Sequence, residues 1–166
     1  ACHLVHPAVD TIKKLLTFTS INDIESLDLE VGDLAMQVTG QKSGKPKSPL
    51  EGKFDLKYCA ALALKGSDLM VQDFSDQAIH NQDTINLTNL VSIKPSRDMG
   101  YTSARLHAQL KDGQKKLVEV AISKGHPGNP INWNDMQTKF NHLVKDEALW
   151  TTIKNFGEKK PFKLFV

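Results

Sequence analysis

The most informative part of the sequence is residues 104–122, which read ARLHAQLKDGQKKLVEVAI. Apolar side chains recur at every second position on both sides of Asp112-Gly113, at Ala104, Leu106, Ala108 and Leu110 and then at Val118, Val120 and Ile122. A period of two is that of a half-buried strand, and Asp-Gly is typical of a tight turn. The segment therefore predicts an antiparallel β-hairpin.

A second alternating stretch lies on the amino-terminal side of this hairpin. Its apolar positions are Leu27, Leu29 and Val31, followed after Gly32-Asp33 by Leu34, Met36 and Val38. This pattern predicts a strand in two parts over residues 27–38, with a bulge or a tight turn at Gly32. A further short strand is predicted at residues 91–94.

Helices are predicted between and around these strands. Pro7 and Asp10 suit a helix start, so a helix is expected over residues 7–18. Ser48-Pro49-Leu50-Glu51 has the capping-box pattern and opens a predicted helix over residues 48–64, on which Leu50, Phe54, Tyr58 and Leu62 form one stripe. Further helices are predicted at residues 71–79, 84–90, 132–143 and 147–154.

These elements favour an α+β fold, with helices packed on a small, mainly antiparallel sheet. A hairpin is present, but repeated strand-helix-strand units are not. No internal repeat divides the sequence, so a single domain over residues 1–166 is expected. Because the chain begins at Ala1 without an initiator Met, we expect it to be a fragment of a larger protein.

Composition excludes several classes of protein. Hydrophobic residues make up 40% and charged residues 24%, which indicates a folded domain. The 21 basic and 19 acidic residues are spread along the chain, so nucleic acid is not an expected partner. No apolar run reaches the roughly 18 residues that span a bilayer, so no membrane partner is expected. Two cysteines suit a reducing compartment, the cytoplasm or an organelle matrix, and leave one disulfide open.

His3 and His6 lie at the start of the first predicted helix. Unpaired backbone amides and the helix dipole favour an anion there, and histidine titrates near neutral pH. His6 could therefore bind a carboxylate as imidazolium or transfer a proton. The alternative is a surface cap at His6 and a frayed end at His3. Two histidines could also begin a metal site, but no cluster elsewhere in the sequence completes it, so no metal is expected.

Tyr58 and the cysteines have structural as well as functional interpretations. Tyr58 is either a tyrosine at the edge of the core or a donor of a hydrogen bond or proton in a cleft. Neither Cys2 nor Cys59 stands beside a feature that would activate a thiolate. The lysines of residues 42–57 either attract an acidic substrate or form a solvated face. No phosphate-binding glycine loop, nucleophile elbow or zinc spacing occurs, so local motifs identify no reaction.

Three segments together resemble the MmgE/PrpD family of 2-methylcitrate dehydratase, cis-aconitate decarboxylase and iminodisuccinate epimerase. CHLVHPAVD at residues 2–10 resembles the stretch that opens the family's smaller, carboxy-terminal domain. SPLEGKFDLKYCAALALKG at residues 48–66 resembles its signature helix. LKDG at residues 110–113, GHPGNP at residues 125–130 and Lys139-Phe140 follow its late pattern of hairpin, loop and helix.

The resemblance implies a domain that covers an active-site cleft against a larger helical domain, in a protein that is usually a homodimer. It implies dehydration, decarboxylation or epimerisation of small polycarboxylates without an obligatory metal or organic cofactor. Tyr58 matches the signature-helix tyrosine that faces the cleft and His6 the family histidine at the helix start, so both are expected to be catalytic. Cys2 stands where decarboxylase-like members can place a histidine, which puts that activity in doubt. Cys2 and His3 are expected to bind substrate, and a family lysine would fall just before Ala1.

Two functions remain open at this point. The first is a substrate-covering domain of a lyase or isomerase, which predicts that Tyr58 and His6 meet at a polar cleft. The second is a non-catalytic dimerisation or interaction module that retains the family scaffold. It predicts that both side chains point into packed core or solvent and that a broad apolar face serves assembly.

Overall fold

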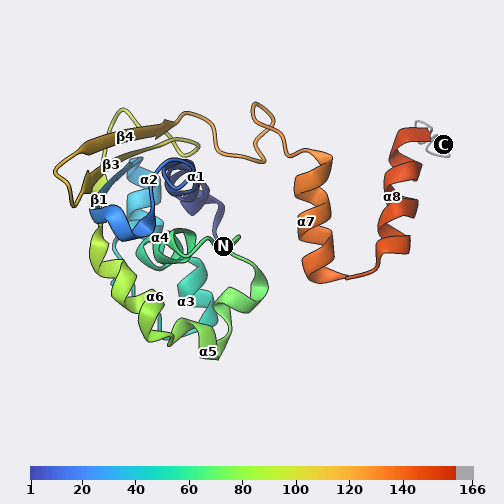
Figure 1. Cartoon of the computed structure of the whole chain (residues 1–166), viewed down its shortest axis with the longest axis horizontal. Coiled ribbons are helices and arrows are strands. Elements are labelled where there is room, and N and C mark those ends of the chain that lie inside the picture. Colours follow the sequence, from blue (N-terminus) through green and yellow to red (C-terminus); the bar gives the residue numbers. More distant parts are fainter. Residues whose placement is uncertain (160–166) are drawn as a thin grey trace. The chain divides into compact units, whose positions relative to one another are not determined.

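The computed structural model describes the backbone of residues 1–159 and the side chains of residues 1–156. The chain forms two compact units, residues 1–129 and the helical segment that begins at Pro130 (Figure 1). Sheet, core and candidate site all belong to the first unit, and the second is a helical hairpin.

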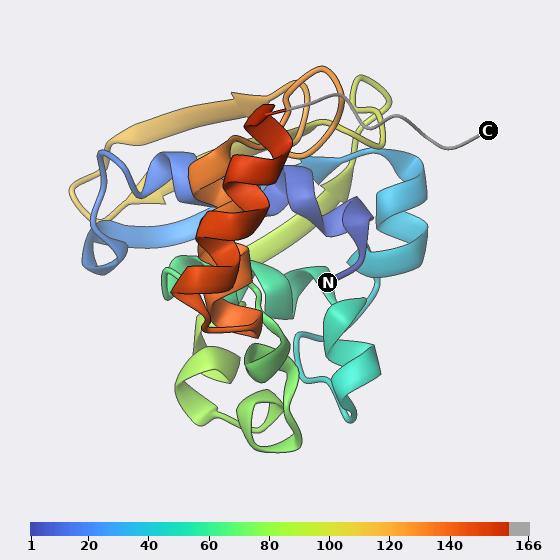
Figure 2. The ribbon, with the colours of Figure 1, turned by 90° about the vertical axis from the view of Figure 1, so that its right-hand side faces the viewer.

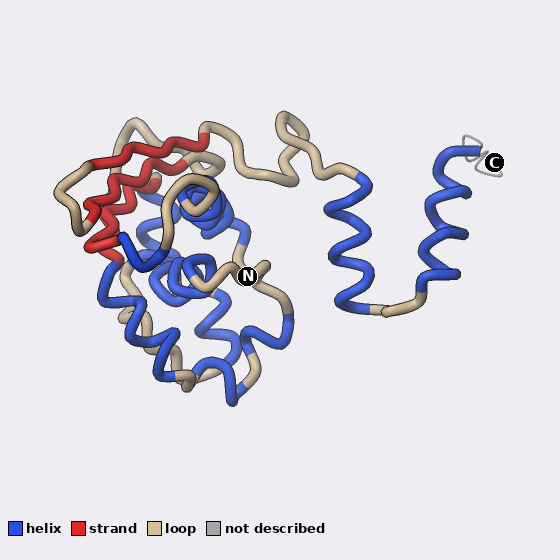
Figure 3. Tube along the Cα trace, in the orientation of Figure 1, coloured by secondary structure: helices blue, strands red, loops and turns tan. Residues whose placement is uncertain are grey.

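A four-stranded sheet forms one layer of the first unit (Figure 3). Its strands stand in the order β2 (Val91–Pro95), β1 (Ile24–Val31), β3 (Ala104–Leu110), β4 (Lys115–Val120). β1 pairs antiparallel with β3, and β3 with β4, whereas β2 runs parallel to β1. The predicted α+β fold, the hairpin of residues 104–122 and the strand at residues 91–94 are therefore confirmed.

One face of this sheet carries the core. Leu27, Leu29 and Val31 of β1 and Leu106 of β3 are buried, while the residues between them face outward. The helices α1 (His6–Leu15) and α4 (Leu56–Leu64) pack against this inner face (Figure 2). Each fully buried Leu or Ile contributes about 1.5–3 kcal/mol relative to an exposed one, so burial here dominates the stability of the unit. The outer face of the sheet is polar and stays open to solvent.

Shorter helices and turns complete the first unit. They are η1 (His3–Val5), η2 (Ile21–Asp23), α2 (Asp33–Ala35), the π-turn η3 (Met36–Gly40), α3 (Pro49–Lys53), η4 (Val71–Phe74), α5 (Asp76–Ile79), α6 (Gln82–Leu87) and η5 (Thr88–Leu90). The helices predicted over residues 71–79 and 84–90 are thus present as pairs of short turns.

The strand predicted over residues 34–38 is wrong. After Gly32 the chain winds into α2 and η3, where the hydroxyl of Thr39 donates to the carbonyl of Ala35 at 2.7 Å. Ala35 and Thr39 are buried on one side of this helical segment, whereas Leu34 is 54% exposed. Apolar residues at alternate positions therefore do not share a face here, and the true period is helical.

The helix predicted over residues 48–64 is two helices. The cap predicted at Ser48 is present, but α3 ends at Lys53. Asp55 then caps α4 by accepting a 3.0 Å hydrogen bond from the amide of Tyr58. The break rotates the predicted stripe, so Leu50 is 66% exposed while Tyr58 is fully buried.

The second unit contains α7 (Trp133–Leu143) and α8 (Glu147–Lys159), close to the predicted helices. Asn132 and Asp135 form a reciprocal capping box at the start of α7. Trp150 is 4% exposed because it packs against Trp133 and Phe140, with ring centroids 5.9 and 5.3 Å away. Within residues 1–159, no helix has the length and apolar character required to cross a membrane.

Candidate functional site

Three exposed rings form a cluster at the start of the chain. His3 meets His6 edge-on with ring centroids 6.4 Å apart, and meets Tyr101 in the same manner at 6.0 Å. Both histidines are exposed, and Tyr101 is 54% exposed. Imidazole nitrogens and a phenol offer donors and acceptors to a polar ligand. The cluster therefore brings together the two predicted histidines with one tyrosine that the sequence did not point to.

The turn η1 runs directly into α1 and sets the position of His3 and His6. The amide of Val5 donates to the carbonyl of Cys2 at 3.1 Å, and the amide of His6 donates to the carbonyl of His3. These two amides are therefore used within the turn and are not free for an anion, contrary to the expectation for the helix start at His6. One turn earlier, the amide of Cys2 is also used, because it donates to the carbonyl of Lys53 at 2.8 Å.

Electrostatics distinguish the two roles considered for His6. The His6 side chain is exposed at its edge, but partial desolvation of its ring lowers its pKa below the usual 6.5, and the neighbouring His3 lowers it further. Asp10 acts in the opposite direction but does not compensate. The lowered pKa favours the neutral form of the His6 imidazole, which suits a proton acceptor better than a cationic anchor.

The segment that carries Tyr101 is fixed by close packing and by hydrogen bonds. A Cβ atom at Gly32 would lie 2.6 Å from the carbonyl oxygen of Met99, so only glycine fits there. The amide of Gly100 donates to the Ser103 hydroxyl at 2.8 Å. This packing explains why a tyrosine between two turns can have a defined place beside His3.

The two cysteines are free thiols in different environments. Cys2 is half-buried, and its amide donates to the carbonyl of Lys53 at 2.8 Å, which ties the amino terminus to the end of α3. Cys59 is buried, and burial raises the pKa of its thiol to about 12. Cys59 is therefore a protonated core residue, whereas Cys2 adjoins the ring cluster in sequence and space.

Tyr58 lies in the core rather than at an open surface. Its side chain is fully buried, its ring packs against Phe74, and its hydroxyl donates to the main-chain carbonyl of Asp73 at 2.8 Å. Burial raises the pKa of Tyr58 to about 12. Among the side chains that the structure describes, Tyr58 and His6 share no hydrogen bond or ring contact, so the two predicted catalytic residues are not brought into direct contact.

No group of three or more His, Cys, Asp or Glu side chains within the described residues is arranged to hold a metal ion. The chemistry available at the ring cluster is therefore that of imidazole, phenol and thiol groups.

Comparison with known proteins identifies a family. Residues 1–149 match the family model of the MmgE/PrpD C-terminal domain. No curated protein matches the chain.

Proposed function

The chain belongs to the MmgE/PrpD C-terminal domain family, and from this premise we propose that it is the substrate-covering domain of a lyase or isomerase. The substrate is a small polycarboxylate, and the reaction is a dehydration or a related proton-transfer reaction that uses no metal or organic cofactor. The observation that carries the proposal is the exposed cluster of His3, His6 and Tyr101, in which the lowered pKa of His6 favours its neutral form.

His6 acts as the general base in this proposal. A polycarboxylate has an acidic C–H next to a carboxylate, and a neutral imidazole can accept that proton as the carbanion character develops. The rings of His3 and Tyr101 and the thiol of Cys2 hold the substrate beside His6 through hydrogen bonds. The leaving hydroxyl in a dehydration, or the carbanion in an epimerisation, then takes a proton from a second group that acts as the acid.

Tyr58 is proposed as that acid, as the family motif implies. Its hydroxyl is protonated at pH 7, and because burial raises its pKa to about 12 it is a stronger candidate for a hydrogen-bond donor than for a rapid proton donor. In the present structure the hydroxyl is engaged with Asp73. The proposal therefore requires the segment that carries Asp73 to shift when substrate binds.

A larger helical domain is the proposed partner that completes the site, within a homodimer. Apolar side chains of the second unit support such docking, because Leu143 is 58% and Leu149 is 43% exposed on a hairpin with a small core of its own. Free thiols at both cysteines fit a reducing compartment, so we place the protein in the cytoplasm.

The test is turnover of citrate-like and aconitate-like acids by the protein that also carries the helical domain. His6→Gln is expected to lower kcat by about 10²–10⁴, the usual contribution of a general base. His80→Gln is the matched control, because His80 is exposed and its Nδ1 lies 2.7 Å from the carbonyl of Asp76 at the start of the preceding helix. Full turnover by the His6→Gln enzyme would rule out the assigned base.

The second candidate is a non-catalytic interaction module. It is favoured by the burial of Tyr58 and by the exposed apolar side chains of the second unit. It predicts that His6→Gln has no effect on any turnover, whereas Leu143→Ser reduces self-association in sedimentation experiments.

A further inference from the structure

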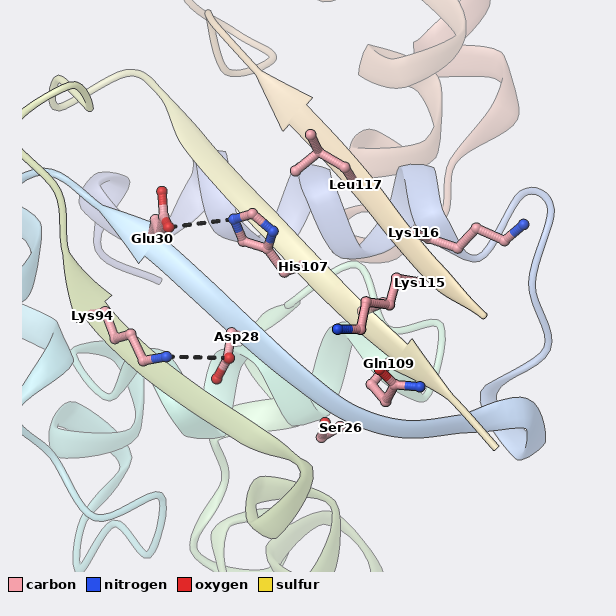
Figure 4. A pocket seen from close by; sticks show the side chains of 10 residues that line it. Ser26, Asp28, Glu30, Lys94, His107, Gln109, Lys115, Lys116 and Leu117 are labelled. Carbon is pink, nitrogen blue, oxygen red and sulfur yellow. Dashed lines mark hydrogen bonds and ion pairs between the residues drawn. The ribbon is translucent and has the colours of Figure 1, made fainter. Parts of the chain in front are cut away.

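The outer face of the sheet carries a hollow of about 560 Å³ (Figure 4). Side chains of all four strands line it. Neither α1 nor α4 covers this face, since both pack on the opposite side of the sheet. The hollow is therefore separate from the ring cluster at the start of α1.

Each carboxylate of the hollow has a cationic neighbour. Asp28 lies 3.2 Å from the ammonium of Lys94, and Glu30 lies 3.0 Å from the guanidinium of Arg105, which also pairs with Glu119 at 2.9 Å. Glu30 also contacts Nε2 of His107 at 3.3 Å. The acidic groups thus have cationic partners and do not repel an incoming anion as free carboxylates would.

Lys115 also lines the hollow, but it takes part in none of these ion pairs. No hydrogen bond or ion pair engages its ammonium among the side chains described for this chain. Figure 4 shows the Lys115 side chain extended over β3 toward the centre of the hollow, whereas Lys116 points away from it. Lys116 is also bonded to Gln114 at 2.9 Å. Lys115 is therefore positioned to meet an anion, and Lys116 is not.

Two more donors stand in the same cross-strand row as Lys115. In the register of the sheet, Lys115 is opposite Gln109, and Gln109 is opposite Ser26. The row therefore presents an ammonium, an amide and a hydroxyl on one face of three adjacent strands. The Gln109 amide donates one N–H to the carbonyl of Leu110 at 3.2 Å, and its second N–H is the one available to a ligand. Oxygen atoms of a carboxylate accept from donors of these kinds.

The next row differs in character. His107 is opposite Leu117, which is 62% exposed. Because Nε2 of His107 faces Glu30, its Nδ1 remains for a ligand, and Leu117 offers an apolar surface beside it. A ligand with a charged end on the first row would place a short carbon chain against Leu117.

We propose that this outer-face hollow binds a small organic acid, with its carboxylate on Lys115, Gln109 and Ser26 and its carbon chain against Leu117. The site lies on the opposite face of the sheet from the proposed active site, and its assignment does not depend on that function.

The test is a titration of the full, isotopically labelled chain with sodium butanoate at constant ionic strength, followed by amide chemical shifts. Saturable shifts at Ser26, His107 and Leu117 are expected. Lys115→Gln is expected to weaken binding about fivefold, the effect of one exposed ion pair. Lys116→Gln is the control, because it removes the same charge from the adjacent residue and should leave the affinity unchanged.

Two further measurements test the contribution of Leu117 and the carbon chain separately from that of the carboxylate. Leu117→Ser should weaken butanoate binding but leave acetate binding unchanged. Inorganic phosphate should bind more weakly than butanoate, because it has no carbon chain. The proposal is overturned if butanoate shifts do not saturate, if Lys116→Gln weakens binding as much as Lys115→Gln, or if phosphate binds as tightly as butanoate.

Discussion

The hydroxyl of Tyr58 donates a 2.8 Å hydrogen bond to the main-chain carbonyl of Asp73. The carboxylate of Asp73 in turn accepts from the Ser67 hydroxyl and the Met70 amide, both at 2.7 Å. The segment of residues 67–73 therefore has internal hydrogen bonds, and it is bonded to α4 at both ends, by the Tyr58 hydroxyl at Asp73 and by the amide of Ser67, which donates to the carbonyl of Leu62 at 3.0 Å. Any role for the Tyr58 hydroxyl in a shared active site depends on opening this segment.

Replacing Tyr58 by Phe tests the bond directly. The variant leaves the Asp73 carbonyl without its donor in a part-buried place, so the free energy of unfolding should fall by about 1–2 kcal/mol. Urea denaturation of the first unit, followed by near-ultraviolet circular dichroism, measures this loss. Tyr101→Phe is the control, since that exposed ring is held by His3 rather than by its hydroxyl, and no loss is expected. Equal stability of the Tyr58→Phe chain would show that the bond is not formed in solution.

Asp55 predicts a pH dependence of stability. Its carboxylate is buried and accepts hydrogen bonds from the amides of Tyr58 at 3.0 Å and Gly44 at 2.8 Å. Burial nevertheless raises the pKa of Asp55 above its usual 3.8. The folded chain thus binds this proton more tightly than the unfolded chain, and the resulting stability is present at low pH and lost as the pH rises through the folded pKa.

Asp55→Asn removes this titration and provides the reference. As the pH rises from about 3.8, the unfolding free energy of the native chain should fall relative to that of Asp55→Asn. Chemical denaturation at several pH values measures it. A difference that does not vary with pH would show that the Asp55 pKa is unshifted.

The sequence predicted the elements that depend on neighbours in the chain. Alternation on both sides of Asp112-Gly113 predicted β3 and β4, and the hydroxyl and amide caps predicted the starts of α3 and α7. These features are local, because strand period and capping are determined within a few residues. The helix start and the apolar stripe pointed to His6 and Tyr58 as candidates, and the family resemblance added the expectation that both are catalytic.

Features that depend on distant residues were not predicted. Asp55 breaks the helix of residues 48–64 partly because its second oxygen holds Gly44, eleven residues earlier. Tyr101 contacts His3 although the two residues lie near opposite ends of the first unit's sequence. No periodic pattern in the sequence points to Tyr101. The alternation over residues 34–38 was misleading because the chain leaves the sheet after Val31 and continues as the helical turns α2 and η3.

Gly32 links the fold to the ring cluster. A methyl group at this position would meet the carbonyl oxygens of Met99 and Gly100 at 2.6 and 2.9 Å, and backbone atoms cannot yield as a flexible side chain can. Gly32→Ala should therefore destabilise the first unit by about 1–3 kcal/mol, the usual cost of overpacking, and shift the resonances of Tyr101. Gly100→Ala is the matched control, because its nearest contact would be 3.9 Å away. Thermal unfolding and the Tyr101 ring resonances of both variants check this.

His6 should titrate below its usual pKa of 6.5. Its ring resonances in a pH series give the midpoint directly, and His3→Gln should raise that midpoint because the charge of His3 lowers it. A lowered pKa also means that the folded chain binds the His6 proton less tightly than the unfolded chain. Stability relative to His6→Gln should therefore be lost as the pH falls below 6.5. A midpoint at or above 6.5 would remove the argument for a neutral base.

Trp150 is the principal core residue of the second unit. It is 4% exposed between Trp133 and Phe140, while neighbouring apolar side chains such as Leu149 remain 43% exposed. Removing a buried tryptophan costs about 3–5 kcal/mol, and two short helices have little other burial to compensate. Trp150→Ala should therefore unfold α7 and α8 while the sheet of the first unit stays protected in amide hydrogen exchange. Thr151→Ala, an exposed neighbour on α8, is the control and should leave both helices protected. Unchanged protection of α7 in the Trp150→Ala chain would show that contacts other than this aromatic cluster hold the hairpin together.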